Sequence, residues 1–293
     1  MATSTYNPNP IDQTSHAVFV PEVWSDQTID FRKSKLVMAN NVQRWDSEVK
    51  AFGDTIHIGE IAEGSAQDVT SGNELTFSKP TATEKTIVVD QWKAYAISRV
   101  DILKVQSKID LMKKYTKVAG YALGKAVDTY LHTLVKNATL TTSDIDAGAS
   151  VVDENVVNAI TQLDIADVPD EGRFWVFHPR AFGDLRKLEK YSEYVATGKA
   201  GLAAGGNNGM LYEVYGIPTL RSTNTATLTT PDPDQDQNLL FHMDGIGLAM
   251  QKDVTYETDR NIHYLADELV ASEIFGGKVL RADHIVRLLR DQA

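Results

Sequence analysis

The chain has 293 residues, of which 42% are hydrophobic and 24% charged, with a formal net charge of −11 and no cysteine. This length is enough for two domains or one large elaborated domain, and the lack of cysteine excludes disulfides and thiolate metal sites. The acidic balance argues against a protein that grips nucleic acid, because phosphate binding needs clustered Lys and Arg. The sequence has no run of about 18 apolar residues and no signal-peptide pattern at its start, so we expect no membrane span.

Residues 1–35 are predicted to form an N-terminal arm and a short helix. The first 17 residues are polar and contain two prolines, so an extended arm and a disordered tail are both open at this point. The apolar piece FVPEVWS follows at 19–25 and leads into a helix that we predict near residues 24–34.

A strand, a polar stretch and a second strand predict a projecting hairpin. Residues 53–58 alternate with period two, as a half-buried strand does, and residues 87–97 are predicted to return as the partner strand. Residues 62–85 between them are rich in Gly, Ser, Thr, Asp and Glu. Such long connections are usually functional or linkers. Since an isolated hairpin is marginally stable, we expect a neighbouring molecule to support this one.

The stretch 107–137 predicts one long helix. Apolar residues recur at gaps of three and four from Val105 to Leu134, which places them on one stripe. About thirty residues at ~1.5 Å each give a rod of roughly 45 Å. Gly120 and Gly124 lie one turn apart. Glycine in a helix interior costs up to about 1 kcal/mol against alanine, so we expect another element to pack closely there.

The remaining chain predicts a compact α+β domain. The stripe at 154–166 indicates a helix, residues 174–177 form a fully apolar strand, and 180–190 indicate a second helix. A glycine-rich loop follows at 196–210. Further strands are predicted at 211–222, 239–250 and 268–275, with a mixed polar stretch at 251–265, a bend at Gly276-Gly277 and a closing apolar segment at 279–289.

No catalytic, cofactor or metal site is predicted. No two of the seven histidines have HxxxH or HExxH spacing, and there is no G-x-S-x-G elbow. The acidic run 231–237 lacks the glycine and the final glutamate of a calcium loop, so we interpret it as a solvated acidic turn. Lysines between 104 and 117 are interpreted as a solvated helix face, with contact to packaged nucleic acid as the alternative. The four tryptophans are assigned to core or subunit packing.

The order of these elements resembles that of the major capsid proteins of tailed bacteriophages, which have the Hong Kong 97-type fold. The similarity extends along nearly the whole chain and rests on the order and spacing of several pieces. These pieces are FVPEVWS at 19–25, GDTIHI at 53–58, DQWKAYAI at 90–97, VPDEGRFWVFHP at 168–179, YGIP at 215–218, LFHMDGIGLA at 240–249 and FGGKV at 275–279.

The resemblance implies an α+β capsid fold with four parts. The first two expected parts are an N-terminal arm with a short helix at 1–35 and an extended loop at 50–93. The third is a peripheral domain that holds the long spine helix and consists of 36–49, 94–150 and 266–293. The fourth is an axial domain at 151–265, whose glycine-rich loop would lie toward a capsomer axis.

The same resemblance implies a structural protein without catalysis or cofactor. It would be the major capsid protein of a tailed double-stranded DNA bacteriophage, assembling in the host cytoplasm into hexamers and pentamers of an icosahedral virion shell. Its expected partners are other copies, a portal, a separate scaffolding protein, possible decoration proteins and packaged DNA held without sequence-specific binding. The expected inter-subunit contacts are Phe19, Trp24, Leu75, Phe77, Lys79, Gly205 and Asn207.

Three other interpretations stay open at this point. An encapsulin-type nanocompartment shell shares the fold but encloses cargo enzymes, so a cargo-peptide groove and particles without DNA would favour it. A soluble α+β enzyme with residues 62–85 as a lid would need titratable groups that converge in a cleft. A phage tail or decoration protein is disfavoured by the long helix and the order of elements.

Overall fold

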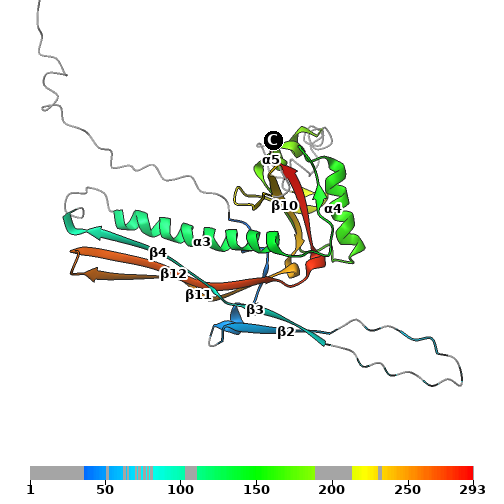
Figure 1. Ribbon diagram of the computed structural model, residues 1–293, viewed down its shortest axis with the longest axis horizontal. Coiled ribbons are helices and arrows are strands. Elements are labelled where there is room, and N and C mark those ends of the chain that lie inside the picture. Colours follow the sequence, from blue (N-terminus) through cyan, green and yellow to red (C-terminus); the bar gives the residue numbers. More distant parts are fainter. Residues whose placement is uncertain are drawn as a thin grey trace, which may run out of the picture.

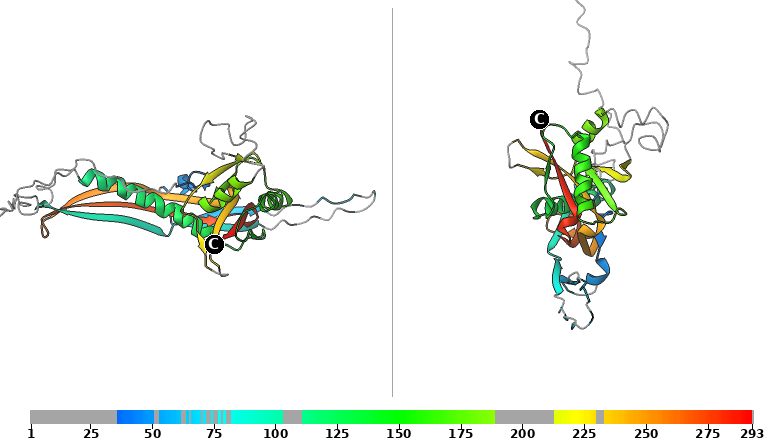
Figure 2. Two further views of the ribbon diagram at one scale, coloured as in Figure 1. Left: turned by 90° about the horizontal axis from the view of Figure 1, so that it is seen from above. Right: turned by 90° about the vertical axis from the view of Figure 1, so that its right-hand side faces the viewer.

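The computed structural model describes residues 36–50, 53–61, 82–102, 111–188, 213–229 and 233–292, together with scattered positions between 64 and 79. The molecule is elongated (Figure 1). A long helix lies along a long sheet at one end, a compact domain lies beside the other end of that sheet, and a hairpin projects in the opposite direction. Figure 2 shows the same arrangement from above and from the side.

The long sheet has four strands in the order β1-β11-β12-β4. Strand β12 pairs antiparallel with β11 on one side and with β4 on the other, and β11 pairs parallel with β1. The strands are β1 (Gln43–Arg44), β4 (Gln91–Val100), β11 (Ile246–Asn261) and β12 (Ala266–Val279), and the short helix α1 (Asp46–Val49) follows β1.

Helix α3 (Leu111–Asn137) lies along one face of this sheet (Figure 1). The predicted helix is thereby confirmed from Leu111 onward, while 107–110 lie outside the described residues. The close packing expected at its two glycines is confirmed. A Cβ on Gly120 would lie 2.6 Å from the Tyr256 hydroxyl, and a Cβ on Gly124 would lie 3.1 Å from Leu36 Cδ1.

Two expectations for the long sheet are wrong. Residues 251–261, expected as a mixed polar stretch, continue strand β11. Their side chains are mostly exposed, so no apolar alternation marks the strand. The bend expected at Gly276-Gly277 is absent, because β12 runs through both residues. A Cβ on Gly276 would collide with the Val88 carbonyl oxygen and lie 2.6 Å from Val89 Cα, so the glycine permits a close approach of two backbones.

The predicted hairpin is confirmed as strands β2 (Thr55–Ile61) and β3 (Ala82–Val88), which pair antiparallel. The single return strand expected at 87–97 is wrong, because β3 ends at Val88 and β4 begins at Gln91. Strand β3 pairs with β2, whereas β4 pairs with β12. Val89 donates its N–H to the Asp54 carbonyl over 2.7 Å and is buried at the base of the hairpin, so the chain changes direction there.

The compact domain is built on a seven-stranded sheet in the order β5-β13-β10-β6-β8-β7, with β9 paired to the start of β10. The predicted apolar strand is confirmed as β6, which has hydrogen-bonded neighbours on both sides. The elements are β5 (Ile145–Asp146), α4 (Asp153–Ile165), β6 (Arg173–Phe177), α5 (Pro179–Lys187), β7 (Glu213–Val214), β8 (Ile217–Arg221), β9 (Thr227–Leu228), β10 (Gln235–His242) and β13 (Ile285–Asp291).

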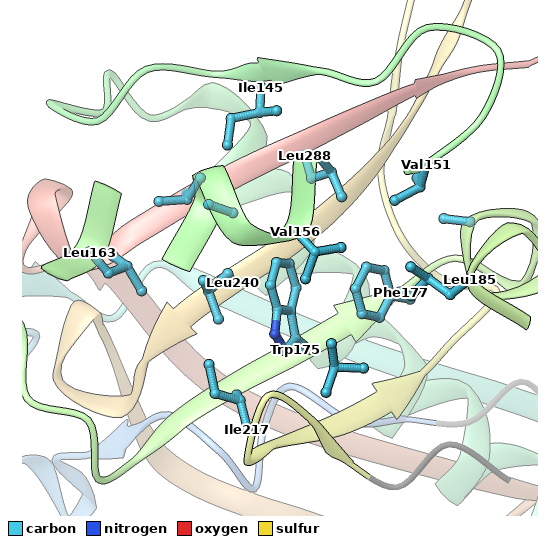
Figure 3. Packing of buried hydrophobic residues seen from close by; sticks show 14 of the residues in the cluster. Ile145, Val151, Val156, Leu163, Trp175, Phe177, Leu185, Ile217, Leu240 and Leu288 are labelled. Atoms are coloured by element: carbon cyan, nitrogen blue, oxygen red, sulfur yellow. The ribbon is translucent and has the colours of Figure 1, made fainter. Parts of the chain in front are cut away.

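The core of this domain lies between the sheet and helices α4 and α5. The Trp175 and Phe177 rings stack there with centroids 4.8 Å apart, and Leu240 and Leu288 pack beside them (Figure 3). All four side chains are buried. The mixed β-sheet with helical cover therefore holds a continuous apolar core, as the α+β prediction requires.

Two further details of this domain differ from expectation. The strand predicted at 211–222 is divided into β7 and β8 by a turn at Tyr215 and Gly216, both at positive φ. The solvated acidic turn predicted at 231–237 is wrong from Gln235 onward, because β10 begins there and Asp236 is buried. Asp236 instead pairs with Arg180 at 3.1 Å.

Helix α3 first leads the chain from β4 of the four-stranded sheet to β5 of the seven-stranded sheet, and the chain then passes between the two sheets twice more. It leaves β10 through the 3-10 turn η2 (Met243–Gly245) into β11, and it leaves β12 through η3 (Ala282–His284) into β13. Consequently β11, expected in the axial domain, lies in the four-stranded sheet, and β13, expected in the peripheral domain, lies in the seven-stranded sheet.

Candidate assembly surfaces

The far end of the four-stranded sheet carries a group of exposed apolar side chains, which we call the sheet tip. Its members come from the end of β4 and from the turn between β11 and β12: Val100, Ile102, Ile262, Tyr264 and Leu265. Ile262 is 77% exposed and Tyr264 74% exposed. Large apolar side chains gathered at an exposed surface mark interaction sites more often than singly scattered ones do.

A network of ion pairs fixes the sheet tip. Arg260 donates two hydrogen bonds to the Asp101 carboxylate at 2.6 Å each and one to Asp267 at 3.1 Å. These hydrogen bonds raise the pKa of Arg260. Arg99 also donates to Asp267 at 3.1 Å, and the Asp101 N–H donates to the Leu265 carbonyl at 2.9 Å. The bidentate geometry holds the end of β4 and the β11–β12 turn together.

The hairpin of β2 and β3 forms the second exposed surface. Beyond its base, Phe77 is 94% exposed, and Ile61 and Val69 are also exposed. The base is anchored, since Ile56, Ile87 and Val89 share a small buried cluster with residues of α1, β11 and the turn before η3. The hairpin thus projects from a fixed point (Figure 1).

Strand β4 offers the third surface. Among the described residues it pairs with β12 alone, so its other side is a free edge with unpaired backbone groups. Trp92 lies on it and is 75% exposed. A shallow groove runs between this strand and α3, lined by Gln91, Lys93, Lys125 and Tyr130 among others. A free edge and an exposed tryptophan are both typical of surfaces that become covered.

The titratable groups of the compact domain pair with one another. His178 caps α5 and places its Nδ1 3.0 Å from Asp236 Oδ2, and burial lowers the pKa of His178. Arg290 donates to Asp184 at 2.6 Å. These ion pairs hold α5 against β10 and β13. Within the described ranges no group of three or more His, Asp and Glu is placed to hold a metal ion, and none of the described helices has the length and hydrophobicity to span a membrane.

The structure describes only part of the predicted contact set. Phe77 and Lys79 are both exposed. Phe19, Trp24, Leu75, Gly205 and Asn207 lie outside the described residues. The sequence did not predict the sheet tip, although the apolar residues of IHYL at 262–265 between two strands are the signal that marks it.

The comparisons with known proteins agree with the fold. The family model described as phage capsid protein matches residues 82–288. No curated protein matches the sequence. A structure from Mycobacterium phage Che8 is 24% identical with a TM-score of 0.75 and covers 92% of this chain and 97% of that chain. The capsid of cyanophage P-SCSP1u has a TM-score of 0.75 at 16% identity, covering 94% of each chain. The head structure of Helicobacter pylori bacteriophage KHP40 has a TM-score of 0.73 at 11% identity, covering 97% and 99%.

The sequence match covers well over half of the chain, and these structural likenesses extend over nearly all of it. The α+β architecture with a spine helix, a projecting hairpin and a compact domain is the one expected from the sequence. The chain therefore belongs to the phage capsid protein family and has the Hong Kong 97-type fold.

Proposed function

We propose that this phage major capsid protein assembles into the hexamers and pentamers of an icosahedral shell around a double-stranded DNA genome. The proposal rests on one observation: the compact domain is well packed, whereas three surfaces elsewhere in the molecule remain exposed. The sheet tip, the hairpin and the free edge of β4 lie on the parts of the molecule that project from that domain (Figure 1). Each gains stability if a neighbouring copy covers it.

The parts of the fold suggest how the copies meet. We assign the seven-stranded domain to the capsomer axis, the four-stranded sheet with α3 to the periphery, and the hairpin to contact with an adjacent copy. Specific interfaces bury about 800 Å² per partner, which an elongated molecule supplies along its length. A portal, a separate scaffolding protein and decoration proteins are further proposed partners, and the host cytoplasm is the proposed place of assembly.

The test is electron microscopy with size-exclusion chromatography on the full chain, expressed alone and with the products of neighbouring genes. Closed shells, tubes, sheets or capsomer rings support the proposal. A monomer under every condition contradicts it. Double-stranded DNA inside particles formed during infection supports the phage shell, whereas particles that enclose a protein cargo and no DNA support the encapsulin alternative.

A matched pair of variants locates the contact. Ile262 at the sheet tip and Ile165 at the end of α4 are both 77% exposed. We expect Ile262→Asp to abolish closed shells, because a carboxylate would have to lose its water in the interface, and Ile165→Asp to keep them. Circular dichroism shows whether each variant remains folded. Shells of normal yield from folded Ile262→Asp contradict a contact at the sheet tip.

A further inference from the structure

The two later crossings between the sheets, from β10 to β11 and from β12 to β13, lie against each other. The Leu280 and Arg281 N–H groups both donate to the Gly245 carbonyl, at 2.8 Å and 3.2 Å. Gly245 belongs to η2, the first crossing, whereas Leu280 and Arg281 lead into η3, the second. We call residues 242–246 and 280–285 the joint, because they form the connections from β10 to β11 and from β12 to β13.

Two buried histidines meet in the joint. The rings of His242 and His284 have centroids 5.5 Å apart and an interplanar angle of 84°. Both residues are almost fully buried. His242 comes from the end of β10 and His284 from η3, so one ring belongs to each crossing. Their edge-to-face contact therefore joins the two crossings through side chains as well as through the backbone.

The hydrogen bonds of His242 require a neutral ring. Its Nε2 lies 2.7 Å from the Glu171 carbonyl oxygen, which can only accept, so Nε2 carries the proton. Its Nδ1 then accepts the Asp244 N–H at 3.2 Å and caps η2. The neutral ring thus bonds the loop before β6 through Nε2 and caps the first crossing through Nδ1.

His284 is placed to resist protonation. Its Nδ1 has no hydrogen-bond partner among the described residues. Burial lowers the pKa of His284, and the positive charges of Arg281 and a protonated His242 act in the same direction, whereas Asp283 and Asp244 oppose them. A neutral ring is the form that this environment stabilises.

The charged groups around the pair compensate an added positive charge on His284 only in part. Asp244 Oδ2 lies 3.7 Å from His242 Nδ1 and Asp283 Oδ2 lies 3.9 Å from His284 Nε2, and about half of each carboxylate side chain is exposed. Arg173, the cross-strand neighbour of His242, adds a buried positive charge that is itself paired with Asp164 and Asp170.

Two glycines lie close to the pair. A Cβ on Gly172 would lie 3.1 Å from His242 Nε2, and one on Gly245 would lie 3.2 Å from His284 Cβ. Gly172 has φ +88°, a conformation that glycine adopts freely. The absence of a side chain at both positions therefore permits the close packing of the joint.

We infer that the joint is a proton-sensitive connection, closed while the His284 ring is neutral and opened when that ring takes up a proton. Opening would break the contacts between the two crossings, while the buried cluster that α3, β10, β11 and β12 share continues to join the two sheets. Because one proton binds on opening, the opening equilibrium rises up to tenfold for each pH unit below the histidine pKa of the open state. The inference concerns the single chain and does not depend on shell formation.

Hydrogen exchange on the full, unassembled chain at pH 7.5 and pH 5.5 tests it, after correction for the intrinsic exchange rate. We expect exchange at the joint to rise at least tenfold at pH 5.5, while the amides of α4 serve as an internal reference. The double variant His242→Gln, His284→Gln has nothing to titrate there and should lose this acid response. His263→Gln, at an exposed position in the β11–β12 turn, is the matched control and should keep it.

An unchanged joint in the wild type at pH 5.5, or an equal acid response in the folded double variant, overturns the inference. If the double variant does not fold, imidazole NMR titration of the wild type decides. The His284 ring should then titrate below the histidines of the urea-unfolded chain, with the amides of the joint shifting in the same step. Ring titration without any response of those amides also overturns the inference.

Discussion

All eight residues of β10 in the seven-stranded sheet are buried, whereas six of the ten residues of β4 in the four-stranded sheet are exposed. The compact domain has a core of sixteen buried apolar residues. Toward the sheet tip, the described residues of α3 and β12 share a small buried cluster of Ala119, Leu123 and Ala271, with Tyr95 and Val254 packed against it. One region is stabilised by its own packing, and the other leaves much of its apolar surface in water.

This difference indicates that one region of the chain mainly stabilises the fold and the other mainly provides surfaces for assembly. Apolar burial stabilises the compact domain before any partner is present. The inner part of the four-stranded sheet shares a buried cluster with α3 and the seven-stranded sheet, whereas its outer part gains further stabilisation when another molecule covers it. Substitutions in the two regions should therefore fail in different assays, and each of the following expectations tests that separation.

The largest expected effect comes from the core of the compact domain. Trp175 is fully buried against Phe177. Trp175→Ala should lower the free energy of unfolding of the unassembled chain by about 3–5 kcal/mol, because it removes a large apolar group and leaves a cavity. Urea denaturation followed by circular dichroism measures this change.

Trp92→Ala is the matched change in the exposed region. Trp92 is mostly exposed on the free edge of β4, so its loss should change the free energy of unfolding by less than about 0.5 kcal/mol but should reduce the yield of assembled particles. If both tryptophan variants lost the same folding stability, the division between the two regions would be wrong.

A smaller effect is expected where the hairpin meets the long sheet. Gly276→Ala would place a Cβ against the Val88 carbonyl and Val89 Cα. Forcing apart a packed contact costs about 1–3 kcal/mol, so we expect a loss of that size in thermal or urea unfolding. Gly59→Ala on β2 is the control, because a Cβ there meets nothing within 4 Å. Equal losses in both variants would show that the close backbone approach is unimportant.

The smallest expected effect depends on pH. Glu273 on β12 is buried and its Oε1 has no hydrogen bond from any described residue. Burial, with a smaller effect from Asp253, raises the pKa of Glu273 to about 7. The folded chain therefore holds this proton more tightly than the unfolded chain, and stability falls as the pH rises from about 4.5 through 7.

Glu273→Gln should relieve that penalty. One pKa unit corresponds to about 1.4 kcal/mol, and since a buried amide also gives up water, we expect a gain of about 1 kcal/mol at pH 8. At pH 4.5 the variant and the wild type should unfold at nearly the same urea concentration. Glu257→Gln on exposed β11 is the control and should show no such pH-dependent gain. A gain for Glu273→Gln that is as large at pH 4.5 as at pH 8 would contradict the buried-carboxylate explanation.

The sequence predicted those elements that are determined by residues close together in the chain. The stripe from Val105 to Leu134 predicted α3, because a helical period is visible in the sequence itself. The end of β11 was missed because residues 256–260 are exposed and lack apolar alternation. Pairing with β12 defines that strand instead. The break at Val89 was missed for the same reason, since Gly276, distant in sequence, sets the path of the backbone there.

The candidate surfaces were predictable to a smaller extent. Phe77 was visible as an apolar residue in a polar stretch, and it is exposed in the structure. Ile262 and Tyr264 resemble ordinary strand residues until the sheet shows that they lie at its end. The contact of His242 with His284 depends on both crossings between the sheets. No spacing rule in the sequence brings these two residues together.

The order of the strands has a consequence for synthesis. Strand β12 lies between β4 and β11, and β13 lies between β5 and β10. Both are late in the chain, so neither sheet can be completed before residues 266–291 have left the ribosome. Until then a nascent chain lacks the completed four-stranded sheet, and with it the sheet tip. Copies can associate through the sheet tip only after β12 has been translated.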